Sequence, residues 1–300
     1  MFSYTLSKRR TRTSKQIVSG NATLRLIDGN RIPLFGLGLY EVDGSSWTTR
    51  LVKSAITMGY RLFDTAEVYE NEHELGEGIR KSSVAREQVY ITSKVYTTEG
   101  GRRQVLDCVR QSLMQLMVDY IDLYLIHAPQ GGHVLEAYDA LHELRNLGRI
   151  RSVGVSNFGI PHLEVIRKSG RPLPVVNQIE LHPFCQQRPI VSYCRRHGIA
   201  LMAYSPMARG AALNDPFVLQ LARKYRRTPA QILLRWSVQN GFIPIPKTNH
   251  PNRLKENFQV FDFRLSANDM RQLTDYGYQQ PMVSGWNPVS NTTSQFGAIY

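Results

Sequence analysis

Three polar residues stand at the ends of short apolar runs in this chain. Asp64, Lys94 and His127 each close such a run, and Tyr69 follows the first of them by five residues. Short apolar runs bounded by polar residues are typical of buried strands. Because the ends of neighbouring parallel strands meet at one edge of a sheet, we expect a carboxylate, an ammonium, an imidazole and a phenol to converge there.

These four groups could carry out proton transfer to a carbonyl oxygen without a metal. A phenol has an ordinary pKa of about 10, so it donates a proton easily only when its anion is stabilised. We expect Lys94 to lower the pKa of Tyr69, Asp64 to keep Lys94 charged, and His127 to hydrogen-bond the oxygen that accepts the proton. The chemistry that this arrangement favours is the reduction of a carbonyl group.

The elements that must position these residues alternate regularly along the chain. At 300 residues and 42% apolar composition, one large α/β domain is expected. Eight strand-helix alternations close naturally into a (β/α)8 TIM barrel, whose active site lies at the C-terminal ends of the strands. The helices are expected to include residues 47–58, 103–117, 135–147, 189–197 and 229–239. The eight strands are expected around Phe35, Phe63, Ile91, Leu123, Val153, Val176, Met202 and Ile243.

The start of the chain differs from the rest. Residues 1–20 are basic, contain no acidic residue and are expected to form a disordered extension, whereas residues 21–300 form the single barrel domain with a C-terminal tail. Asp28-Gly29-Asn30 predicts the turn of a β-hairpin. A doubly wound dinucleotide-binding domain is disfavoured because Gly36-Leu-Gly38 does not continue into a G-x-G-x-x-G motif.

Three segments in order resemble the signatures of the aldo-keto reductase family, and the resemblance spans residues 22 to about 280. The segments are residues 59–76, 151–158 and 245–257. The resemblance implies that Asp64, Tyr69, Lys94 and His127 are the catalytic tetrad. It also implies that the N-terminal hairpin plugs the bottom of the barrel, and that the enzyme reduces aldehydes and ketones with NADPH, giving NADP+.

The same resemblance implies a set of cofactor-binding residues. Ser156, Asn157 and Gln178 would hold the nicotinamide carboxamide, and Tyr204 would stack on the ring. Lys247 and Arg253 flank a helix start at Pro251, where an adenosine 2′-phosphate would bind, so NADPH is favoured over NADH. The complete set is Gly38, Asp64, Ser156, Asn157, Gln178, Tyr204, Ser205, Lys247, Thr248, Arg253, Glu256 and Asn257.

The expected substrate pocket departs from many members of the family. Tyr40, Tyr96 and Ala128 stand where tryptophan is common, and Trp286 belongs to a tail that would fold over the barrel mouth. The segment after His127 is also short. These features predict a wide mouth, similar to that of the short-looped reductases of small aldehydes and diketones.

Charge and cysteine content restrict the partners. The net charge of +13 is dispersed and forms no aromatic-interleaved stripe, so no nucleic acid is expected, and no apolar run is long enough to span a membrane. Three scattered cysteines argue against a disulfide framework and a zinc site, so no metal is expected. We expect a monomeric cytoplasmic enzyme, with mitochondrial import through the basic N-terminus as the alternative. A slow-turnover, NADPH-bound redox-sensing or interaction subunit is the alternative function.

Overall fold

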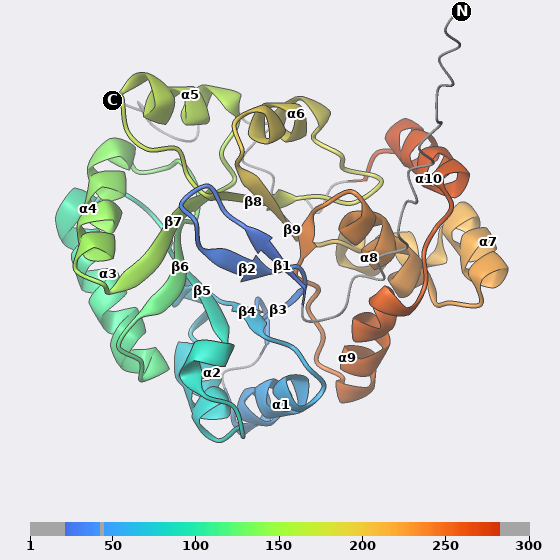
Figure 1. The fold of residues 1–300 in the computed structure, drawn as a ribbon, viewed down its shortest axis with the longest axis horizontal. Coiled ribbons are helices and arrows are strands. Elements are labelled where there is room, and N and C mark those ends of the chain that lie inside the picture. Colours follow the sequence, from blue (N-terminus) through green and yellow to red (C-terminus); the bar gives the residue numbers. More distant parts are fainter. Residues whose placement is uncertain (1–21, 43–44, 283–300) are drawn as a thin grey trace, which may run out of the picture.

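The structure, a computed structural model, describes residues 22–42 and 45–282 of the chain. Eight parallel strands pair in sequence order and helices surround them (Figure 1), so the predicted (β/α)8 barrel is confirmed. Each strand lies at or next to its predicted centre. The strands of the barrel are β3 (Gly36–Gly38), β4 (Leu62–Asp64), β5 (Tyr90–Val95), β6 (Ile121–Ile126), β7 (Ile150–Ser156), β8 (Val176–Glu180), β9 (Ala200–Tyr204) and β10 (Ile243–Pro244).

The helices lie outside the barrel, and the five predicted ones agree with the structure to within two residues at each end. Their starts follow from local chemistry: the Thr228 hydroxyl accepts a hydrogen bond from the Gln231 amide at the start of α8, and Pro229 fills its first turn. The helices are α1 (Ser46–Thr57), α2 (Glu72–Arg80), α3 (Gly101–Leu116), α4 (Val134–Asn146), α5 (Ile160–Lys168), α6 (Arg188–Arg196), α7 (Pro216–Tyr225), α8 (Pro229–Gln239), α9 (Pro251–Phe258) and α10 (Ala267–Gln279).

The predicted hairpin is formed by β1 (Thr23–Arg25) and β2 (Arg31–Pro33) and lies across one end of the barrel (Figure 1). Leu26 and Ile32 are buried among the side chains that fill the inside of the barrel. On β6, Leu123 and Leu125 belong to this inner core, whereas Tyr124 packs outward against the helices. The hairpin therefore closes the bottom by adding apolar side chains to the inner core.

The barrel closes between its first and last strands. The Gly38 amide donates to the Pro246 carbonyl over 3.1 Å, and a Cβ on Gly38 would lie 2.8 Å from the Ile245 carbonyl oxygen. Glycine is needed here for the approach of two strands. In this structure the absence of a side chain at Gly38 is explained by the close approach of the backbone at Ile245 and Pro246, whereas Gly38 was predicted from the sequence to contact the cofactor.

Two sequence expectations fall on parts of the chain outside the described residues: the basic extension at residues 1–20 and the tail that contains Trp286. Within residues 22–42 and 45–282, no helix is both long enough and apolar enough to cross a bilayer.

Gly76→Ala tests how tightly α2 is held against the rest of the molecule. Replacing a glycine by alanine in a helix interior normally stabilises a protein, because glycine loses more conformational freedom on folding. Here the new Cβ would overlap the carbonyl group of Leu116 at the end of α3, so we expect a loss of about 1–3 kcal/mol in the free energy of unfolding. Urea denaturation measures this loss. His73→Ala, at an exposed position on the same helix, should change stability by less than about 0.5 kcal/mol, and a stabilised Gly76→Ala would show that the two helices can separate freely.

Candidate active site

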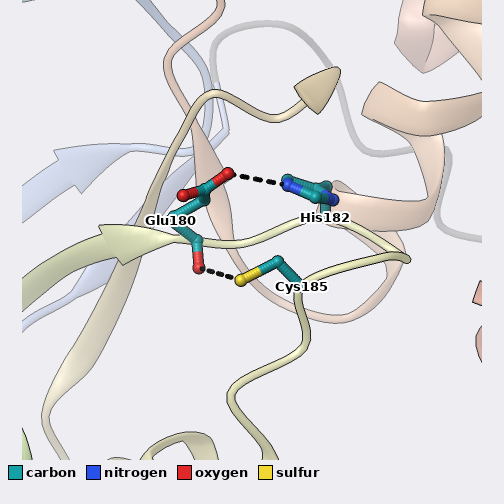
Figure 2. A group of neighbouring side chains, drawn as sticks. All are labelled: Glu180, His182 and Cys185. Carbon is teal, nitrogen blue, oxygen red and sulfur yellow. Dashed lines mark hydrogen bonds and ion pairs between the residues drawn. The ribbon is translucent and has the colours of Figure 1, made fainter. Parts of the chain in front are cut away.

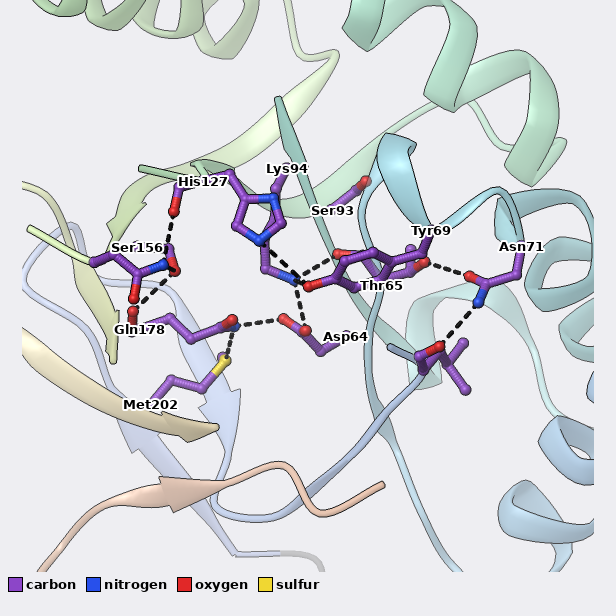
Figure 3. A network of polar contacts seen from close by, with 12 residues as sticks. Asp64, Thr65, Tyr69, Asn71, Ser93, Lys94, His127, Ser156, Gln178 and Met202 are labelled. Atoms are coloured by element: carbon purple, nitrogen blue, oxygen red, sulfur yellow. Dashed lines mark hydrogen bonds and ion pairs between the residues drawn. The ribbon is translucent and has the colours of Figure 1, made fainter. Parts of the chain in front are cut away.

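The four residues predicted to converge do so at the C-terminal rim of the barrel (Figure 3). Asp64 ends β4, Lys94 lies in β5, and His127 directly follows β6. Tyr69 ends the short 3₁₀ helix η1 (Glu67–Tyr69), which begins just beyond β4. The Tyr69 hydroxyl is 3.5 Å from Lys94 Nζ and 3.3 Å from His127 Nε2.

Lys94 is buried at the centre of this group. Its ammonium donates to Asp64 Oδ1 at 2.6 Å, to the Thr65 carbonyl at 2.7 Å and, more weakly, to the Tyr69 hydroxyl. Three acceptors therefore match the three N–H bonds of an ammonium. Burial lowers the pKa of Lys94 and raises the pKa of Asp64, and the ion pair between them opposes both shifts.

The expectation that Lys94 lowers the pKa of Tyr69 is wrong for the protein without its cofactor. Burial raises the pKa of Tyr69 well above 10, and the negative charge of Asp64 raises it further. The physical reason is burial, which disfavours the phenolate by more than the ammonium, 3.5 Å away and paired with Asp64, favours it. Tyr69 therefore keeps its proton firmly at neutral pH.

His127 is buried beside Tyr69, with the two rings meeting edge to face. Burial lowers the pKa of His127 to about 3, and the positive charge of Lys94 adds to that shift. The imidazole is therefore neutral at physiological pH. A neutral imidazole can donate one hydrogen bond to a substrate oxygen without competing for its proton.

Asn71 holds the loop that carries Tyr69, and no role was predicted for it from the sequence. Asn71 is fully buried, and its amide nitrogen donates to the carbonyls of Leu39 and Val42 at 2.9 and 3.1 Å. Its amide oxygen accepts from the Thr65 hydroxyl at 2.7 Å. Asn71 thus ties the loop after β3 to the loop after β4. Its place two residues after Tyr69, at the start of a helix, was the available signal.

The predicted amide-bearing residues lie next to this group: Asn157 directly follows β7, and Gln178 lies within β8. Gln178 Nε2 donates to Asp64 Oδ2 at 2.5 Å (Figure 3). Asn157 Nδ2 donates to the His127 carbonyl at 2.9 Å. The partly exposed Tyr204 donates to Asn157 Oδ1 at 2.9 Å. Asn157 has a positive φ of 60°, a conformation that asparagine tolerates better than most residues and that often occurs at functional sites.

The second predicted group lies around the start of α9. Arg253 is exposed and forms no ion pair with a described residue, while Lys247 is partly exposed. Thr248 is buried and accepts a hydrogen bond from the His250 amide at 3.0 Å. Of the other residues predicted near the adenosine, Glu256 accepts a hydrogen bond from the Thr228 hydroxyl at 2.6 Å, and Asn257 is buried. Ser205 lies apart from them, directly after β9, with a φ of 44°.

Two of the predicted pocket residues line the mouth and one does not. The ring of Tyr40 lies 5.1 Å from that of Tyr69, the ring of Tyr96 lies 5.8 Å from that of His127, and both tyrosines are exposed. Ala128 has no exposed surface, so the structure does not place it on the pocket wall. The chain turns inward there, since the Gln130 amide donates to the Ala128 carbonyl.

A cavity of about 500 Å³ lies at the opposite end of the barrel, beside the hairpin. Its buried carboxylate, Asp122, is already paired with Arg86 at 2.7 Å and with Arg151 at 3.6 Å. The groups suited to catalysis are instead those at the C-terminal rim, where barrel enzymes carry their active sites.

Comparison with known proteins agrees with this geometry. The model of the aldo/keto reductase family matches residues 36–277. The chain belongs to this family. It is 42% identical to a glyoxal reductase of Bacillus subtilis, with 84% of this chain and 91% of the relative covered, and 39% identical to the methylglyoxal reductase DkgA of Yersinia pestis, with the same coverage. An aldo-keto reductase of Bombyx mori in complex with NADP superimposes with a TM-score of 0.80 at 36% identity, covering 88% of this chain and 96% of that one.

Family membership fixes the general class of activity. Aldo-keto reductases are oxidoreductases that act on carbonyl groups and use NADP(H). The predicted enzyme class and the predicted cofactor are therefore confirmed, whereas the roles of individual residues stay predictions.

Stability should depend on pH through His127. In the unfolded chain this residue takes up a proton near its ordinary pKa of 6.5, whereas the folded protein resists protonation until about pH 3. The unfolded state thus binds more protons between these values, so acidification from pH 7 to pH 5 should cost about 2 kcal/mol through His127.

Urea unfolding of wild type and His127→Gln at pH 7 and pH 5 measures this term. The variant should lose about 2 kcal/mol less than wild type on acidification, while His73→Gln, at an exposed position, should follow wild type. Equal losses in wild type and His127→Gln would show that His127 is protonated in the folded protein.

Proposed function

We propose that this chain reduces small aldehydes and ketones to alcohols, with Tyr69 as the general acid that protonates the carbonyl oxygen. The observation that carries the proposal is the position of the Tyr69 hydroxyl, which lies at the barrel rim between Lys94 Nζ and His127 Nε2. Distances of 3.5 and 3.3 Å are long for hydrogen bonds, and catalytic contacts of this kind commonly shorten when substrate binds.

The rim residues fit a nicotinamide cofactor. Gln178 in β8 and Asn157 just after β7 supply amide groups on neighbouring strands, suited to a carboxamide, and Tyr204 offers a partly exposed ring beside them. Ser156, Ser205 and Asp64 complete this region. Bound NADPH would supply the hydride, and the protein would hold the carbonyl group between the cofactor and Tyr69.

The raised pKa of Tyr69 suits this role. Hydride addition turns the substrate oxygen into an alkoxide, whose conjugate acid is about as weak as water, with a pKa of roughly 16. A phenol that keeps its proton at neutral pH is in the donor form when the substrate binds. As Tyr69 releases its proton, the Lys94 ammonium stabilises the phenolate, Asp64 holds Lys94 in place, and neutral His127 donates to the substrate oxygen.

Preference for NADPH over NADH is assigned to the start of α9. Arg253 is exposed there without a described ion-pair partner, and Pro251 begins the helix, whose first N–H groups favour an anion. Arg253 and Lys247 would hold the 2′-phosphate. Thr248, Glu256 and Asn257 would support the adenosine.

Small dicarbonyl compounds are the substrates that we favour. Two relatives bear the names glyoxal reductase and methylglyoxal reductase, and the mouth of this chain is lined by Tyr40 and Tyr96, which pack on Tyr69 and His127. One ring beside Tyr69 and one beside His127 favour a compact carbonyl compound between them. The cysteines are unpaired among the described residues, which fits work in the cytoplasm.

Tyr69→Phe should reduce kcat for methylglyoxal by about 10²–10⁴-fold, because the variant lacks the acid. Its affinity for NADPH, measured by fluorescence titration, should change little. Lys94→Met should also lower kcat, since the phenolate would lose its cation. Retention of more than about a tenth of wild-type kcat by Tyr69→Phe would remove this residue from the role. A wild-type protein that binds NADPH but fails to oxidise it in a single turnover would favour the sensing alternative.

Arg253→Ala should weaken NADPH binding by about 1.5–3 kcal/mol and NADH binding far less, because only NADPH carries the 2′-phosphate. Fluorescence titration with both cofactors gives the two dissociation constants. Arg271→Ala, which removes an exposed arginine from α10, is the matched control and should leave both constants unchanged. If Arg253→Ala weakened the two cofactors equally, the 2′-phosphate would have to bind elsewhere.

A further inference from the structure

Three side chains that can bind metals meet just after β8, outside the catalytic group. They are Glu180, His182 and Cys185, and their ligand atoms lie within 4.8 Å of one another. Glu180 and His182 have no exposed surface and Cys185 has 9%. Figure 2 shows His182 facing the carboxylate of Glu180 and Cys185 facing its carbonyl. The proposed reduction uses none of the three.

The local fold explains why these residues meet. Glu180 and His182 are two residues apart in extended chain, so their side chains point to the same side. His182 and Cys185 form an antiparallel bridge with two reciprocal backbone hydrogen bonds of 3.2 and 3.0 Å, which puts the Cys185 side chain on that side as well. The pattern is therefore E-x-H-x-x-C, with the turn bringing the last residue back to the first two.

The turn is fixed from outside by α10. The Gln186 side chain donates to the carbonyls of Pro183 and Thr274, both at 2.6 Å. Gly277 packs so closely on Pro183 that a Cβ there would lie 2.5 Å from the Pro183 carbonyl oxygen. Contacts from a separate helix hold the three donors in place before any ion arrives, which lowers the cost of binding one.

We propose that Glu180, His182 and Cys185 bind one Zn²⁺ ion. Carboxylate, imidazole and thiolate are the three ligand types that zinc takes in proteins. Zinc bond lengths place neighbouring ligand atoms ~3.3–3.6 Å apart in a tetrahedral site. Glu180 Oε1 and His182 Nε2, at 3.0 Å, are already near that separation, and rotation of the side chains would draw the sulfur in.

A fourth ligand is available beside the sulfur. The amide group of Gln187 lies 3.7 Å from Cys185 Sγ. Its oxygen and nitrogen exchange places by rotation of the amide, so the oxygen can turn toward the ion. Water is the other ligand suited to this position.

The competing explanations of the cluster are weaker. A reactive thiol must be accessible to its reaction partner, whereas only 9% of Cys185 is exposed. A purely structural explanation has two hydrogen bonds, one between Glu180 and His182 and one from the Cys185 thiol to the Glu180 carbonyl, but it gives no reason for three different metal-ligand types to meet in one turn. In addition, His182 Nδ1 is buried without a hydrogen-bond partner among the described residues, so the contact with Glu180 orients the ring and turns Nε2 toward the proposed ion.

Cobalt(II) titration of tag-free, metal-stripped full-length protein tests the proposal. Co²⁺ replaces Zn²⁺ in such sites, and its bond to a thiolate gives a charge-transfer absorption band. We expect this band to saturate at one Co²⁺ per chain and to disappear when Zn²⁺ is added. Cys185→Ala should abolish the band, whereas Cys194→Ala, which removes another buried thiol, should retain it.

Further variants keep the test decisive if one of them folds poorly. His182→Gln should retain the thiolate band but raise the dissociation constant for Co²⁺ about tenfold or more. Near-UV circular dichroism confirms the fold of each variant. Absence of the band in wild type, its persistence in folded Cys185→Ala or its loss in folded Cys194→Ala would overturn the proposal. Carbonyl reduction does not enter these measurements, so their outcome is independent of the proposed function.

Discussion

The ion pair between Lys94 and Asp64 is the interaction around which the C-terminal rim of the barrel is built. The Lys94 side chain has no exposed surface and that of Asp64 has 4%, with 2.6 Å between the charged atoms. Replacing one partner of a buried pair leaves an uncompensated charge and typically costs about 3–5 kcal/mol. The two strands that carry the pair, β4 and β5, must therefore keep their register, in which Phe63 lies opposite Ile91 and Asp64 opposite Thr92.

A continuous set of hydrogen bonds leads from this pair around the rim. One carboxylate oxygen of Asp64 accepts a hydrogen bond from Lys94 and the other accepts one from the Gln178 side chain. The backbone carbonyl of Gln178 accepts from the Ser156 hydroxyl and from the backbone amide of Asn157. The Asn157 side chain in turn donates to the His127 carbonyl. The groups proposed to bind the nicotinamide and those proposed to move the proton share Asp64 as a common acceptor. A displacement of either set of residues would therefore disturb the hydrogen bonds of the other set through Asp64. This is a physical reason for the barrel to hold both sets rigidly.

The sequence predicted which residues meet at the rim, because a parallel barrel brings all strand ends to one edge and the apolar runs locate those ends. The positions of Asp64, Lys94 and His127 could be predicted without knowing the conformation of any loop. Properties that depend on burial could not be read in this way. The pKa of Tyr69 is set by the protein that covers it, so its direction was predicted wrongly, and the burial of Ala128 depends on the fold of the loop that carries it.

The cluster at the end of β8 escaped the sequence analysis for a related reason. Scattered cysteines argue against zinc only when ligands are sought as pairs of cysteines, whereas here the alternation of β8 and the following turn bring together three different residue types. The same strand carries Gln178 two residues before Glu180, and Glu180 lies opposite Tyr204 in the sheet. An ion bound to Glu180 would therefore restrain the backbone of β8 next to Gln178 and opposite Tyr204, the two residues on these strands that are proposed to contact the nicotinamide. The two sites use separate side chains, but they depend on one strand end.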